Sequence, residues 1–140
     1  GAPLAALALA DGDMLKARRE RFAELMAIAA GKGDPIAAAA RWSAEEAGPV
    51  LDWLSAWLMD MIRFKQAGAN PSAGGADLAG ELQRLAEPVD LTCLFRRLDR
   101  VLEARRLTGA SINRQLLFED LLLDWVPGAA TQRAIASEPR

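Results

Sequence analysis

Apolar and polar residues recur along this chain with the period of an α-helix. In residues 14–30, 47–65 and 89–107 the apolar positions repeat at i, i+3, i+4 and i+7, whereas segments of alternating β-branched residues are missing. The pattern predicts an all-α protein, a single helical bundle of about five main helices plus one or two short ones. No fixed-period repeat is visible, which argues against a solenoid.

The first thirty residues are predicted to contain two helices. A short apolar helix at Pro3–Ala10 is expected to end at the Asp-Gly-Asp of residues 11–13. A second helix, Met14–Ala30, is expected to end at Gly31 and Gly33. Its apolar face consists of Leu15, Phe22, Leu25, Met26 and Ala29.

Two cap signals follow the glycine turn. Asp34 and the proline after it are typical of the start of a helix, here a short alanine-rich one that reaches Trp42. Ser43, with Glu46 three residues later, has the form of a capping box and predicts a helix at about Ala47–Lys65. We expect this helix at the centre of the core, because its apolar face covers about half of the cylinder. That face consists of Val50, Leu51, Trp53, Leu54, Trp57, Leu58, Met61, Ile62 and Phe64.

Glycine, asparagine and proline in residues 67–76 predict an exposed loop. A short helix, Leu78–Ala86, and a corner at residues 87–88 lead into a long helix, Val89–Leu107, which Thr108 and Gly109 are expected to end. The apolar stripe of the long helix consists of Leu91, Leu94, Phe95, Leu98, Val101 and Leu102.

The last predicted helix, Ile112–Val126, is apolar on nearly all sides. Only Asn113, Asp120 and Asp124 gather on a narrow polar stripe, whereas an ordinary surface helix carries a single apolar face. Such a helix is expected to be buried on two sides. One side would face the core of the bundle, and the other either a second layer of the same chain or another subunit; the pattern leaves both open.

The boundaries of that helix separate a domain from a tail. Asn113 and Ser111 both qualify as its N-cap, and the proline and glycine of residues 127–128 end it. We therefore expect a helical domain in residues 1–126 and a flexible carboxyl-terminal tail in residues 127–140.

Size and charge narrow the possible classes. A chain of 140 residues suits one domain, which buries roughly 68% of the surface that its unfolded form exposes. The formal net charge of −2 gives no bulk attraction to nucleic acid or anionic lipid. The longest apolar run, residues 50–64, is interrupted by charges and is shorter than the ~20 residues of a membrane span. Without an initiator methionine or a basic leader, the sequence is expected to be a fragment of a larger protein and to carry no signal peptide.

Catalytic and metal-binding residues are sparse. The sequence has no histidine and one cysteine, Cys93, so a structural zinc site, an intramolecular disulfide and the usual serine or cysteine nucleophile schemes are not expected. Phosphate-binding glycine motifs are missing as well, and we expect neither a metal nor a cofactor. Cys93 is expected to be inert. Asp120 and Asp124 are spaced for one helix face, where a solvated stripe is favoured over a general acid and base.

Arginines and tryptophans are interpreted structurally. The arginines of residues 96–106 predict a solvated helix face with i, i+4 ion pairs, while contacts with a partner protein or with nucleic acid remain open alternatives. They are Arg96, Arg97, Arg100, Arg105 and Arg106. The tryptophans are interpreted as core or interface anchors rather than as a cofactor site. They are Trp42, Trp53, Trp57 and Trp125.

Three stretches together carry a family resemblance. They are "GAPLAALALADGD" at residues 1–13, "LDWLSAWLMDMIR" at residues 51–63 and "GASINRQLLFEDLLLDW" at residues 109–125. The chain resembles the carboxyl-terminal domains of delta-prime subunits of bacterial DNA polymerase III clamp loaders over about residues 1–126. The third stretch is the most specific.

The resemblance implies a role in assembly. In that family five such helical domains form a ring-shaped collar, so the expected partners are the gamma/tau and delta subunits of the loader, reached through the last helix in a cytoplasmic complex. No direct contact with nucleic acid and no catalytic activity are expected from this domain. The implied interface residues are Asn113, Leu117, Phe118, Leu121, Leu122 and Trp125.

One departure from the family pattern fits this interpretation. The ATPase subunits of clamp loaders begin this region with a glycine, a small residue, any residue and an arginine that senses nucleotide phosphates. Here Leu4 stands at the arginine position, and leucine cannot hydrogen-bond a phosphate. The departure favours the delta-prime branch, which does not hydrolyse ATP.

Two other classes remain as alternatives. A regulatory or ligand-binding bundle would need an apolar pocket between the tryptophan-rich helix of residues 47–65 and the last helix. An enzyme that uses carboxylates is the least favoured class, because the visible acidic pairs lie on polar faces.

Overall fold

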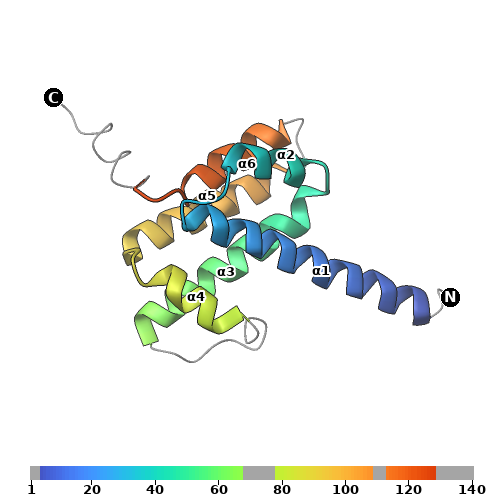
Figure 1. The fold of residues 1–140 in the computed structure, drawn as a ribbon, viewed down its shortest axis with the longest axis horizontal. Helices are drawn as coiled ribbons and strands as arrows, with labels where there is room; N and C mark the ends of the chain where they lie inside the picture. The colour runs from blue at the N-terminus through green and yellow to red at the C-terminus, as the bar shows by residue number, and fades with distance from the viewer. Residues whose placement is uncertain (1–3, 68–77, 109–112, 129–140) are drawn as a thin grey trace.

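A computed structural model describes residues 4–67, 78–108 and 113–128 (Figure 1). These residues form six α-helices and contain no strand, which confirms the prediction of an all-α bundle. The helices are α1 (Leu4–Ala29), α2 (Pro35–Ser43), α3 (Ala47–Ala67), α4 (Ala79–Ala86), α5 (Leu91–Leu107) and α6 (Arg114–Leu123). Ser111, most of the predicted loop at 67–76 and most of the predicted tail lie outside the described residues.

Helix α1 runs without a break through the predicted stop at residues 11–13. The prediction of two separate helices is therefore wrong. A glycine inside a helix costs about 1 kcal/mol relative to alanine, which long flanking helical segments tolerate. The amino-terminal half of α1 projects beyond the other helices (Figure 1), and Leu15, predicted on the apolar face, is 53% exposed. Among the α1 residues whose side chains are described, residues 12–29, the first apolar one in the core is Phe22.

The turn after α1 needs both of its glycines. Gly31 has φ +78° and donates its N–H to the carbonyl of Ile28 at 3.0 Å, while Lys32 donates to the carbonyl of Ala27 at 2.9 Å. These two bonds form a Schellman motif, which favours glycine at the left-handed position. At Gly33 an added Cβ would lie 2.9 Å from the backbone nitrogen of Ile28. The predicted helix end at Gly31 is confirmed.

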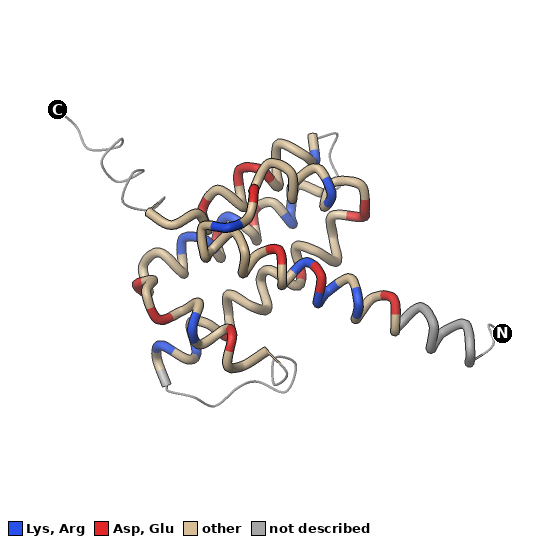
Figure 2. The backbone as a smooth tube through the Cα atoms, viewed as in Figure 1, with Lys and Arg blue, Asp and Glu red and all other residues tan. Residues whose placement is uncertain are grey.

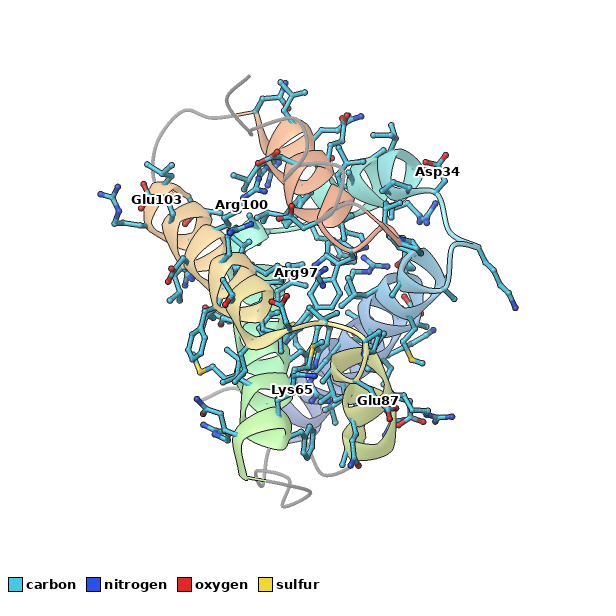
Figure 3. The ribbon with its side chains drawn as sticks, turned by 90° about the vertical axis from the view of Figure 1, so that its left-hand side faces the viewer. Asp34, Lys65, Glu87, Arg97, Arg100 and Glu103 are labelled. Carbon is cyan, nitrogen blue, oxygen red and sulfur yellow. The ribbon has the colours of Figure 1, made fainter. Side chains whose placement is uncertain are left out.

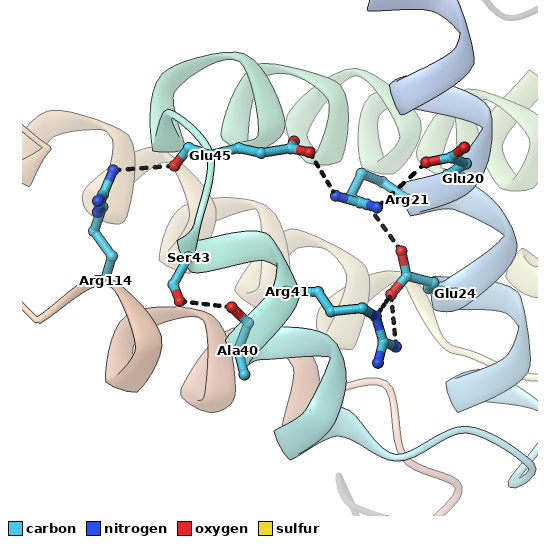
Figure 4. Close-up of polar contacts among 8 residues, drawn as sticks. All are labelled: Glu20, Arg21, Glu24, Ala40, Arg41, Ser43, Glu45 and Arg114. Atoms are coloured by element: carbon cyan, nitrogen blue, oxygen red, sulfur yellow. Dashed lines mark hydrogen bonds and ion pairs between the residues drawn. The ribbon is translucent and has the colours of Figure 1, made fainter.

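One of the two predicted caps around α2 is confirmed. The carboxylate of Asp34 accepts a hydrogen bond from the N–H of Ile36 at 2.9 Å. The predicted capping box is wrong, because Ser43 is the last residue of α2 and its hydroxyl donates backwards to the carbonyl of Ala40 at 2.9 Å (Figure 4). A serine in the last turn of a helix has that carbonyl within reach, which the spacing of Ser43 and Glu46 could not reveal.

Helix α3 forms the centre of the core, as predicted. Eight of its nine predicted apolar residues are buried, and Trp53 is half-buried. Helix α5 packs along α3 in the opposite direction. At one end Arg105 pairs with Asp52 at 2.9 Å, and at the other Lys65 donates to the carbonyl of Ala86, the last residue of α4, at 3.1 Å.

The predicted apolar stripe of α5 is only partly buried. Leu94 and Val101 lie in the core, whereas Phe95 and Leu102 are 44% and 45% exposed. The stripe is wider than the surface that α3 covers, so its outer edge faces solvent.

A buried arginine of α1 connects this helix to the turn between α2 and α3 (Figure 4). The side chain of Arg21 is 8% exposed and pairs with Glu24 at 2.9 Å and Glu45 at 3.2 Å. Arg41 of α2 pairs with Glu24 at 2.7 Å. Arg114, the first residue of α6, donates to the carbonyl of Glu45 at 3.0 Å. The turn between α2 and α3 is thereby tied to both α1 and α6.

Candidate subunit interface

Helix α6 begins at a defined cap and lies beside α2 (Figures 1 and 3). Asn113 has an extended backbone, and its side chain accepts a hydrogen bond from the N–H of Leu116 at 3.1 Å. This bond satisfies one of the free N–H groups of the first turn, so Asn113 is the N-cap. The helix is shorter than predicted. It ends at Leu123, and residues 124–126, which were predicted to be helical, form a turn.

Four of the six predicted interface residues lie in the core of the domain itself. Phe118 and Leu122 are fully buried, and Leu121 and Trp125 are 4% and 5% exposed. Phe118 makes an edge-on contact with Trp42 of α2, with 5.7 Å between the ring centroids. Within the single chain these side chains hold α6 against the bundle.

The opposite side of α6 keeps exposed leucines that the sequence analysis did not select. Leu116 is 60% exposed and Leu123 is 38% exposed. A spacing of seven residues places them on one stripe of the helix, opposite the buried Leu121 and Trp125. Leu117 is half-buried on a different side of the helix, about 100° around the axis from Leu116. Periodicity could not choose between the sides, because apolar residues surround the whole helix.

Arg100 ties α6 to α5 (Figure 3). Arg100 binds the carboxylate of Asp124 at 2.8 Å and also the carboxylate of Asp120. The side chain of Asp124 is 9% exposed, so the prediction of a solvated stripe is wrong at this residue, whereas Asp120 is 61% exposed. The i, i+4 acidic pair is thus a structural link between two helices, since one guanidinium binds both carboxylates.

The crease between α5 and α6 is a shallow groove of about 360 Å³. Ala104, Leu107, Leu117 and Leu121 supply its apolar lining, and charged residues of α5 and α6 surround them. Leu107 is 37% exposed. The groove therefore adds apolar surface beside the outward stripe of α6.

A second groove of about 610 Å³ lies where α1, α4, α5 and the end of α6 meet. Its apolar lining includes Met26, Leu85, Val89 and Trp125, and it contains no residue of α3. The ligand-binding alternative requires a pocket between α3 and α6. This groove is not that pocket, because α3 does not line it.

Cys93 lines the same groove. Burial is the main cause that raises the pKa of its thiol above the ordinary value, and the neighbouring carboxylate of Asp90 acts in the same direction. Asp90 caps α5 by accepting from the N–H of Cys93 at 2.8 Å, and this bond lowers the pKa of the Asp90 carboxyl. A thiol that stays protonated at neutral pH is a poor nucleophile, which agrees with the prediction of an inert cysteine.

Four arginines of α5 have partners within the chain, namely Arg97, Arg100, Arg105 and Arg106. Arg106 pairs with Glu103, which lowers the pKa of the glutamate and raises that of the arginine. The guanidinium of Arg97 lies 4.9 Å from the ring centroid of Trp125. Figure 2 shows basic and acidic positions interspersed along α5 and most other helices. Basic positions on the described helices are thus accompanied by acidic ones, whereas phosphate binding favours clustered basic residues.

The described residues also bear on metal binding and on membrane insertion. No group of three or more cysteine, aspartate or glutamate side chains in that part of the chain is arranged to hold a metal ion. None of the described helices is long and apolar enough to cross a membrane.

Comparisons with known proteins give one matching family and two similar relatives. Residues 12–126 match the family described as DNA polymerase III, delta subunit, C terminal. The chain is 34% identical over 125 residues to DNA polymerase III subunit delta' of Escherichia coli strain K12, covering 88% of this chain and 36% of that protein. It is 29% identical over 142 aligned positions to the Yersinia pestis subunit of the same name, covering 93% of this chain and 42% of that protein.

The chain thus spans about two fifths of the length of these relatives. The comparison with solved structures gave no match. The match at residues 12–126 covers nearly all of the described helices, from the middle of α1 to the turn after α6. The chain therefore belongs to the family of carboxyl-terminal domains of DNA polymerase III delta-type subunits.

Proposed function

We propose that this domain is a non-catalytic assembly domain of a DNA polymerase III clamp loader, of the delta-prime type. It binds adjacent loader subunits in a collar of helical domains and contributes architecture to sliding-clamp loading. Both named relatives are delta-prime subunits, which supports the assignment to this branch. The partners proposed for it are the gamma/tau and delta subunits.

One observation carries this proposal. Leu116 and Leu123 stay 60% and 38% exposed on one stripe of α6, although Phe118, Leu121 and Leu122 of the same helix are buried in the core. Each exposed leucine side chain that a partner buries contributes about 1.5–3 kcal/mol at most. We therefore place the interface on the outward stripe of α6 and in the adjoining α5–α6 groove, which contains Leu117.

The six residues inferred from sequence have two roles in this proposal. Leu117 contacts the partner directly, and Asn113, which is exposed at the start of α6, lies at the border of the interface. The buried residues hold the stripe in position. They are Phe118, Leu121, Leu122 and Trp125.

The test is a binding measurement on the full-length subunit that carries this domain, with each of the other loader subunits. We expect Leu116→Asp to weaken binding to one subunit at least tenfold, because a carboxylate in an apolar interface core loses its hydration. Leu123→Asp should weaken the same pair.

Circular dichroism provides the folding control, because both variants replace exposed side chains and should keep the helical spectrum. The matched control is Leu15→Asp on the projecting part of α1, where the leucine is 53% exposed. Undiminished binding by both α6 variants, or no binding by the unaltered subunit, would refute the proposal.

A further inference from the structure

Arg21 of α1 is a buried cation whose guanidinium reaches carboxylates on two elements. Its side chain is 8% exposed, and a charge that has lost its water needs such partners. Nε donates to Glu24 at 2.9 Å, Nη2 lies 3.6 Å from Glu20, and Nη1 lies 3.2 Å from Glu45 in the turn between α2 and α3 (Figure 4). Because each nitrogen of the planar group has a different partner, the side chain is held in one orientation, and the carboxylate of Glu45 is held with it.

Glu45 also binds α6. Its backbone carbonyl accepts a hydrogen bond from Nη1 of Arg114 at 3.0 Å (Figure 4). One residue therefore binds α1 through its side chain and α6 through its main chain. The contacts from Arg21 through Glu45 to Arg114 form a continuous connection between two helices that are distant in the sequence.

The contact of Arg114 acts at the start of α6. Arg114 is the first residue of this helix, and Leu116 of the outward stripe lies two positions later. Further along, Phe118 packs in the core, and Asp124 binds α5 just after the helix ends. The cap by Asn113 is internal to the helix start and moves with it. The bond from Arg114 to the α2–α3 turn thus orients the first turn of α6, which carries Leu116.

We propose that Arg21 is a positioning residue for the α6 interface, because through Glu45 and Arg114 it holds the first turn of α6 so that Leu116 faces the partner subunit. This inference rests on the proposed assembly function. Substitutions along such a connected network change binding at a distant site by about two- to thirtyfold. A role in stability alone would lower the folded fraction and leave the affinity of the folded protein unchanged.

The experiment measures the affinity of the full-length subunit for the loader subunit that Leu116→Asp affects. We expect Arg21→Met and Glu45→Ala each to weaken binding about three- to tenfold. Glu45→Ala keeps the carbonyl that Arg114 binds, so its effect reports the missing carboxylate. In a double-mutant cycle, Arg21→Met should cause less than a twofold further loss in the Arg114→Met background, because both variants break the same connection.

The matched control is Leu82→Ala on α4, a fully buried position outside this network. It destabilises the domain by opening a cavity, yet it should change the affinity of the folded subunit less than twofold. Hydrogen exchange of the free subunit gives a second readout that needs no partner. In Arg21→Met the amides of residues 113–121 should exchange at least threefold faster, while those of residues 79–86 should change less than twofold.

Three binding results would overturn the inference. Affinity could stay unchanged in both Arg21→Met and Glu45→Ala, the effects of Arg21→Met and Arg114→Met could multiply in the double variant, or Leu82→Ala could weaken binding as much as Arg21→Met. Failure of the assembly function is distinct, because then the unaltered subunit binds no partner. Hydrogen exchange alone then decides, and unchanged exchange at residues 113–121 in Arg21→Met would overturn the positioning role.

Discussion

Arg100 binds two carboxylates whose contributions to stability differ because their exposure differs. Asp124 is 9% exposed and Asp120 is 61% exposed in the side chain, although both contact the same guanidinium. A solvated ion pair contributes roughly 0–1 kcal/mol, whereas a buried hydrogen bond to a charged group contributes about 1.5–3 kcal/mol. The link between α5 and α6 therefore depends mainly on the buried half of the pair.

This difference predicts unequal effects of two substitutions. Arg100→Met should lower the free energy of unfolding by about 2–3 kcal/mol, because it removes the charged donor of a buried carboxylate. Asp120→Asn should lower it by less than about 1 kcal/mol. Urea denaturation followed by circular dichroism measures both values. Arg100→Met breaks both pairs and Asp120→Asn only the exposed one, so equal losses in the two variants would show that the buried pair with Asp124 contributes nothing.

At the scale of the element, α6 combines a core helix with an exposed apolar stripe. Its start is fixed by Asn113, and its position by Phe118 against Trp42 on one side and by Arg100 on the other. A helix of ten residues is too short to be stable by itself in water. Its orientation, and thus which leucines face outward, depends on these tertiary contacts.

Asn113 has a local role as the N-cap of α6, and this role can be tested apart from its proposed place in the interface. Asn113→Ala should lower the free energy of unfolding by about 1 kcal/mol, because the N–H of Leu116 loses its acceptor. Asn113→Ser keeps an acceptor and should restore most of that stability. Thermal or urea unfolding provides the measurement. If the serine variant is as unstable as the alanine variant, the cap is not what stabilises the helix start.

At the scale of the whole molecule, two antiparallel helix pairs share one core. Helix α3 pairs with α5, α2 pairs with α6, and α1 crosses both pairs (Figure 1). The buried contact of Phe118 with Trp42 packs α6 against α2. Leu116 and Leu123 lie on the outside of the second pair, so each can be altered without opening the core.

Substitutions inside and outside the core should therefore separate folding from binding. Phe118→Ala should cost about 3–5 kcal/mol of unfolding free energy, because it opens a cavity in a fully buried site. Leu116→Ala should change that energy by less than about 0.5 kcal/mol, as surface substitutions usually do. Denaturant titration measures both. A large loss in Leu116→Ala would mean that the outward stripe stabilises the monomer itself.

Local signals in the sequence predicted much of the fold. The glycine turn at Gly31, the cap at Asp34 and the central apolar helix at residues 47–65 depend on the conformation or periodicity of adjacent residues, and the structure confirms them. The predicted stop at residues 11–13 is wrong, because the helix continues through the glycine there. The predicted capping box at Ser43 is wrong, because the serine hydroxyl donates to the nearby carbonyl of Ala40 instead.

By itself the sequence determined the helical class, the central position of α3 and the excess of apolar surface on α6, because these follow from composition and period within single segments. Only the tertiary structure decided which side of α6 faces the core, that Asp124 is buried against Arg100, and that Phe95 and Leu102 are exposed. The physical reason is that burial is a relation between segments distant in the chain. A helix that is apolar on every side fits a core in several rotations, and its neighbours select one of them.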